Sequence, residues 1–267
     1  MIALVLFLTA GLAIAVGGLG SDDAADEGEA SPDDVTPTDP TDVILPAGTE
    51  HTTGDPGGFN IELVFEGEGW TEEVRDLAIQ AGEQLSDVIT EDIPDHNGID
   101  DIRIGLRLDA IDGISGVLGR GGPDSLRPGS LLPNEGSVII DSADAQSSSF
   151  ATYGEDLFLH EMLHALGFGT TWDLQGLVQQ APDGSDRFTG TNAIAEYQES
   201  FPTEAAADPH SSFGVPLASD EGHWDEPVFG TEIGTPLLSS SNVLSELTLA
   251  SLEDLGYQTI RVAGAAT

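Results

Sequence analysis

The stretch HEMLHALGFG at residues 160–169 decides how the rest of this chain is understood. On an α-helix of 3.6 residues per turn, His160 and His164 lie one turn apart on the same face, so both imidazoles can point at a single ion. Glu161 lies beside that face, where its carboxylate can take a proton from a water molecule next to the ion. Apolar residues before the motif and Gly167 after it predict a buried helix that ends abruptly. The alternative is a helix carrying two unrelated histidines.

The composition excludes several classes of partner and site. The chain has 48 acidic and 7 basic residues among 267, which gives a formal net charge of −41. Such a surface repels nucleic acid and anionic membranes, so we expect no nucleic-acid partner, and contact with a membrane only through the N-terminal apolar segment if that segment is retained. Salt of about 1 M would screen the self-repulsion, and the composition therefore indicates a salt-adapted (halophilic) protein; selection of cationic substrates is the weaker reading. Because cysteine is absent, any metal must be held by histidine and carboxylate.

The first 57 residues predict an exported protein with a tether. Residues 1–20 carry no charge and are largely apolar, which is typical of an export signal peptide or a retained membrane anchor; a buried core helix fits less well. Residues 21–57 are rich in acidic residues, Pro and Thr, and predict a disordered linker. We expect a folded domain at residues 58–267, with an N-lobe at 58–167 and a C-lobe at 168–267. It would be extracellular, either secreted or anchored to the outer face of the cell membrane.

Periodicity predicts an α+β fold. Residues 60–66 alternate as a strand, and residues 70–89 place apolar side chains at helical spacing behind Thr71 and an acidic first turn. Further strands are expected at residues 101–108 and 136–141, separated by a Gly/Pro-rich loop at 113–133 that encloses a short strand at 114–118.

Three acidic clusters could each bind calcium. They are Asp141 with Asp144, the loop at residues 95–98 and the loop at residues 183–186. None has the spacing of a known calcium loop, and in so acidic a chain solvated turns are the simpler account.

Two histidines make only part of a catalytic zinc site, which needs a third protein ligand. The downstream candidates are His210, His223, Glu196 and Glu199. In a compact zinc-peptidase plan the third histidine stands three residues after the glycine that ends the helix, but that position is Thr170 here. A plan completed by a later helix would use Glu196. Spacing alone leaves the choice open.

Four later segments carry a resemblance to a known family. They are residues 188–197, 214–217, 222–236 (GHWDEPVFGTEIGTP) and 244–257. The series resembles the leishmanolysin-like branch of the metzincin metallopeptidases from about residue 137 to 260, and more weakly back to residue 59. The resemblance implies that His223 is the third ligand of one catalytic Zn²⁺, with His160 and His164. It also implies a zincin-like N-terminal lobe, with a twisted mixed sheet and two long helices, and a smaller irregular C-terminal lobe with a helix. By this resemblance and by analogy, we expect the strand at 138–141 to lie at the edge of the active-site cleft, where an extended substrate could add as a further strand.

The resemblance implies a zinc-dependent endopeptidase, with Glu161 as general base and protein or peptide substrates. We expect a monomer. One departure is Gly234, which stands where metzincins carry a methionine in a tight turn beneath the zinc. Gly234 favours an alternative function, a catalytically weakened, zinc-stabilised binding or adhesion module of the same fold. A third interpretation is a salt-adapted surface protein with no stoichiometric metal.

Overall fold

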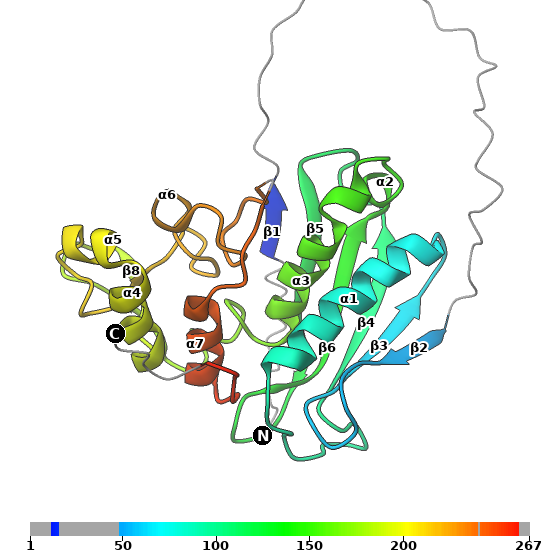
Figure 1. The fold of residues 1–267 in the computed structure, drawn as a ribbon, viewed down its shortest axis with the longest axis horizontal. Coiled ribbons are helices and arrows are strands. Elements are labelled where there is room, and N and C mark those ends of the chain that lie inside the picture. Colours follow the sequence, from blue (N-terminus) through cyan, green and yellow to red (C-terminus); the bar gives the residue numbers. More distant parts are fainter. Residues whose placement is uncertain (1–11, 16–47, 240, 262–267) are drawn as a thin grey trace, which may run out of the picture.

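A computed structural model describes residues 12–15, 48–239 and 241–261 of the chain. In this part of the chain the fold is α+β, as predicted, with a mixed open sheet and seven α-helices (Figure 1). The six-stranded sheet has the order β1-β5-β6-β4-β3-β2, and three short strands form a second sheet.

The centre of the large sheet is parallel. β3 (Ile61–Glu66), β4 (Ile102–Asp109) and β6 (Pro133–Asp141) run in one direction, and β3 and β4 alternate between buried and half-buried residues. This alternation matches the predicted pattern, since successive side chains of a strand point to opposite faces. β2 (Thr49–Thr52) pairs antiparallel with β3, so the prediction of a linker up to residue 57 is wrong at its end.

Two helices cover one face of this sheet (Figure 1). α1 (Glu72–Val88) begins at the predicted cap, because the Thr71 hydroxyl accepts a hydrogen bond from the Val74 amide at 3.2 Å. α3 (Gly154–Ala165) packs beside α1 and carries the histidine motif. Trp70 and Phe158 stack between the helices and the sheet, with ring centroids 6.2 Å apart. The helix that carries the histidine motif is therefore packed against the apolar face of the sheet.

β5 (Val117–Leu126) corrects two predictions. It is a strand of ten residues in a region expected to be mostly loop, and it pairs antiparallel with β6. β6 therefore lies inside the sheet, and the expected place of residues 138–141 at the cleft edge is wrong. The close approach of β5 to α3 explains its composition: a Cβ built at Gly121 would lie 2.0 Å from the Glu161 carbonyl oxygen. Only glycine fits at this position. Because glycine is uncommon in strand interiors, residue propensities did not predict β5.

Most of the predicted leader and linker lies outside the described residues. Within residues 1–20 only β1 (Leu12–Ala15) is described, and it pairs antiparallel with β5. These four residues are a strand, which does not match the alternative of a core helix. No helix in the described part of the chain is long and apolar enough to cross a membrane.

The C-terminal region is more regular than predicted. It contains four of the helices and the small sheet, rather than irregular chain with one helix. The elements are β7 (Val178–Gln180), β8 (Asp186–Phe188), α4 (Thr191–Ser200), α5 (Pro202–Ala207), β9 (Val215–Pro216), α6 (Glu226–Phe229) and α7 (Glu246–Leu255). Between β6 and α3 lie α2 (Ser142–Ala145) and a 3-10 turn, Phe150–Thr152.

Candidate metal centre

The end of α3 fixes the first two histidines. Gly167 has φ 103°, and the amides of Gly167 and Phe168 donate to the carbonyls of His164 and Leu163 at 3.1 and 3.0 Å. This pair of bonds is a Schellman motif, which favours glycine because of its positive φ. The turn brings the Phe168 carbonyl back onto the helix, where it accepts the His164 Nδ1–H at 2.9 Å. The predicted abrupt end of the helix is confirmed.

Three imidazoles converge on one point. The Nε2 atoms of His160 and His164 are 2.8 Å apart, and each lies 3.2 Å from Nε2 of His223. All three side chains are at most 1% exposed. The structure thus brings together the two histidines of the helix motif and the downstream histidine that the resemblance implied.

The other ring nitrogen of each histidine has an acceptor. The Nδ1 atoms of His160, His164 and His223 face the Ile233 carbonyl at 2.6 Å, the Phe168 carbonyl at 2.9 Å and the Asp220 carboxylate at 2.8 Å. Because each Nδ1–H donates to an oxygen, the neutral tautomers leave three Nε2 lone pairs facing one another.

Three converging lone pairs repel unless a cation lies between them. Tetrahedral zinc with nitrogen ligands at about 2.0–2.1 Å separates them by about 3.3 Å, close to the spacings in this structure. The pKa of His160 is well below its usual range, first because of burial and then because of repulsion from His164 and His223. Burial, and then repulsion from His223, lower the pKa of His164 to about 3. His160 and His164 are therefore neutral, and the group of three histidines could hold a metal ion.

A close backbone contact brings His223 back to α3. A Cβ built at Gly169 would lie 2.1 Å from the Gly222 carbonyl oxygen, so the two loops touch where neither has a side chain. Beyond that contact Asp220 accepts from His223 Nδ1 and, through its other oxygen, from the Gly222 amide at 3.1 Å. Burial alone would raise the pKa of Asp220, but the hydrogen bonds from His223 and the Gly222 amide hold that pKa below its usual range. Sequence reasoning missed Asp220, although its place three residues before His223 was visible.

Glu161 is a buried carboxylate with no hydrogen-bond partner in the described part of the chain. It is fully buried, and both of its oxygens lack a protein donor. Burial raises its pKa well above the usual range, and the charge of Arg120 partly opposes that shift. An unsatisfied buried carboxylate is costly to the fold, and such groups concentrate at functional sites. Its position directly after His160 suits proton transfer at the centre.

The other candidate ligands lie elsewhere. Glu196 is paired with Arg261 at 3.0 Å and accepts from the Ser200 hydroxyl. His210 lies 3.4 Å from Asp183, and Glu199 is exposed. Among the described residues, none of these three side chains is close enough to share an ion with His160 and His164.

Two of the three acidic clusters suggested for calcium, at Asp141 with Asp144 and at residues 183–186, accept hydrogen bonds from backbone amides. Asp141 Oδ2 accepts from the amides of residues 111, 112 and 113 at 2.8–3.0 Å, and Asp144 Oδ1 accepts from the Ser115 amide. Asp183 likewise accepts from Ser185 within its own turn. Apart from the histidines, the one group of side chains in the described chain close enough to share an ion is Asp92, Asp100 and Asp101. That group was not among the predicted clusters.

No space exists for a side chain at Gly234. A Cβ there would lie 2.4 Å from Phe168 Cζ, 2.8 Å from Trp224 Cδ1 and 2.9 Å from Glu232 Oε2. The rings of Phe168 and Trp224 pack with centroids 5.4 Å apart, next to Trp172. Aromatic rings and a carboxylate therefore fill the region where a methionine was expected.

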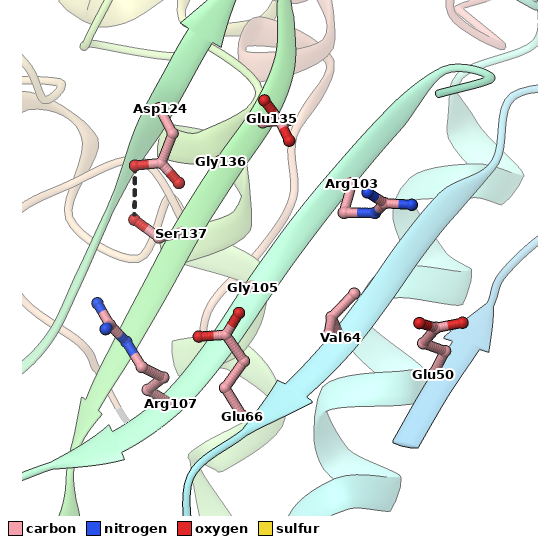
Figure 2. Close-up of a pocket in the computed structure, with 10 residues that line it drawn as sticks. All are labelled: Glu50, Val64, Glu66, Arg103, Gly105, Arg107, Asp124, Glu135, Gly136 and Ser137. Carbon is pink, nitrogen blue, oxygen red and sulfur yellow. Dashed lines mark hydrogen bonds between the residues drawn. The ribbon is translucent and has the colours of Figure 1, made fainter. Parts of the chain in front are cut away.

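A hollow lies on the face of the large sheet opposite α1 and α3. Figure 2 shows its charged side chains, which come from β2 to β6, including Arg103, Arg107, Glu66 and Asp124. Its volume is about 510 Å³, and it contains no residue of the histidine centre.

Comparison of the chain with protein-family models and with curated proteins found no match.

Proposed function

We propose that the chain is a zinc-dependent endopeptidase of the leishmanolysin-like metzincin kind. The observation that carries the proposal is the set of three Nε2 atoms 2.8–3.2 Å apart, each with its Nδ1 held by an acceptor. The residue after His160 is Glu161, a buried carboxylate with no hydrogen-bond partner among the described residues. Three neutral nitrogen ligands leave one position of a tetrahedral ion open, as in catalytic zinc sites.

His160, His164 and His223 would hold the ion through their Nε2 atoms. Zinc bound there supplies Lewis-acid polarisation of a peptide carbonyl and a water of lowered pKa. Glu161 accepts the proton of the attacking water and then delivers it to the leaving amine, which is general acid–base catalysis by one carboxylate. The raised pKa of Glu161 moves it towards the pH at which it must both take up and release a proton.

The alternative function, a zinc-stabilised binding module, shares the ligands but has no use for Glu161. Burying a carboxylate without a partner costs stability, and a binding module would gain from replacing it. The state of Glu161 therefore favours the enzyme.

The experiment compares wild type with Glu161→Gln in high salt. Both proteins should hold one zinc per chain, because Glu161 is not a ligand, and only wild type should hydrolyse casein. We expect the loss to be at least 100-fold, the scale of a general base. Full activity of Glu161→Gln would refute the role of this residue.

A further inference from the structure

A second buried carboxylate, Glu232, lies beside the candidate centre and has no part in the proposed chemistry. It is 3% exposed and follows α6 in the chain. Unlike Glu161, both of its oxygens accept hydrogen bonds. Burial raises its pKa to about 7, and hydrogen bonds from Thr248, Gly234 and Ser245 oppose that shift by favouring the ionised form.

Glu232 fixes the turn that contacts the centre. Its Oε2 accepts the Gly234 amide at 2.5 Å. Between them, the Ile233 carbonyl accepts His160 Nδ1–H at 2.6 Å. The Gly234 carbonyl accepts the amide of Trp224, the residue after His223, at 2.9 Å. One short turn thus contacts His160 directly and the backbone next to His223.

The other oxygen anchors this turn to α7. Glu232 Oε1 accepts the hydroxyls of Thr248 and Ser245 at 2.5 and 2.9 Å. Thr248 Oγ1 in turn accepts the Trp224 indole N–H at 2.9 Å. Every partner of Glu232 is a donor, so an ionised carboxylate satisfies the whole set. An amide of the same shape would turn its NH₂ group towards at least one of these donors.

We propose that Glu232 is a positioning residue of the metal centre, which holds the Ile233 carbonyl against His160 and thereby orients that imidazole towards the ion. Partners that orient a ligating histidine fix its tautomer and ring direction, and their loss commonly lowers metal affinity 10–100-fold. Gly234 belongs to the same arrangement, because a side chain there would meet Glu232 Oε2 at 2.9 Å. The inference rests on the proposed metal site.

The test is zinc affinity, measured on the full chain by competition with a chelator in high salt. Glu232→Gln should bind zinc 10–100-fold more weakly than wild type. Its cobalt-substituted form should show a shifted visible absorption spectrum, since the field of the ligands changes when His160 turns. The matched control is Asp254→Asn, which alters a half-buried carboxylate that also accepts two backbone amides, from Asn192 and Ala193. It should lower the melting temperature but leave zinc affinity and the cobalt spectrum unchanged.

A second pair of variants decides the matter if Glu232→Gln does not fold. Thr248→Val removes the hydroxyl that joins Trp224 to Glu232 and should weaken zinc binding several-fold, whereas Thr248→Ser keeps the hydroxyl and should bind as wild type does. Unchanged zinc affinity in Glu232→Gln, or equal affinities in the two Thr248 variants, would overturn the inference while leaving the proposed function intact. Absence of zinc from wild type would instead refute the proposed function, and this inference with it.

Discussion

Placing a methionine at Gly234 should damage this protein, although the metzincin pattern has one at that position. The nearest atom to a Cβ at Gly234 would be Phe168 Cζ at 2.4 Å, followed by Trp224 Cδ1 at 2.8 Å. Carbon atoms pack best at about 3.5–4.0 Å, so Phe168 or the turn must move by about 1 Å for the first atom alone. Overpacking of this kind typically costs about 1–3 kcal/mol, and a methionine adds three further heavy atoms.

We therefore expect Gly234→Met to lower the free energy of unfolding by about 3 kcal/mol or more, which corresponds to a melting temperature lower by about 6–12 °C in a domain of this size. Zinc affinity should fall as well, because the Gly234 turn contacts His160 through Ile233. The assay is thermal unfolding in high salt, with bound zinc measured on the same samples. Gly122→Ala is the matched control, since a Cβ at Gly122 meets no atom within 4 Å and its φ is not positive. Equal or higher stability and zinc affinity in Gly234→Met would refute the reasoning.

Three further predictions follow from other features of the chain. Asp220→Asn should weaken zinc binding 10–100-fold, because the carboxylate that accepts from His223 Nδ1 at 2.8 Å is lost; unchanged affinity in chelator competition would show that this contact does not orient the ligand. Because the chain has a net charge of −41, its acidic residues repel one another, and salt should screen this repulsion. The melting temperature should therefore rise steeply between about 0.1 and 1 M KCl, where the Debye length falls from about 10 to 3 Å. A melting temperature that does not depend on salt would contradict the salt-adapted interpretation. Burial raises the pKa of Asp101 from 3.8 to about 6, so protonation of Asp101 stabilises the folded state fully below pH 3.8, and this stabilisation is lost as pH rises through 6. Denaturant unfolding from pH 4 to 7 should therefore show a smaller loss of unfolding free energy in Asp101→Asn than in wild type, and parallel pH profiles would show that Asp101 does not titrate as expected.

Local sequence patterns were sufficient to predict the elements whose residues follow a single periodicity. β3, β4 and α1 were predicted because alternation or helical spacing runs through each, and Thr71 marks the start of the helix. His160 and His164 needed only the geometry of one helical turn. These features depend on residues close in sequence.

Elements shaped by distant contacts were missed. β5 contains glycines at 119, 121 and 122 and a proline at 123, a composition typical of a loop, yet its glycines allow the strand to lie against Glu161. β2 is a short strand of half-buried and exposed residues, with no apolar run to mark it. In both cases the decisive partner lies far away in the chain.

The third histidine shows the same limit. Spacing could not choose between Glu196 and His223; the choice came from a resemblance, and His223 reaches the centre through the contact of Gly169 with Gly222. The roles of Asp220 and Glu232 depend on hydrogen bonds that form only in the folded chain.

Bound zinc in wild type, His223→Ala and Glu196→Ala tests the central claim most directly. The three proteins would be purified in high salt, equilibrated with zinc, and analysed for metal per chain by mass spectrometry. We predict one zinc per chain in wild type and Glu196→Ala, and a sharp loss in His223→Ala. No stoichiometric zinc in wild type, or zinc retained by His223→Ala and lost from Glu196→Ala, would contradict the proposed centre.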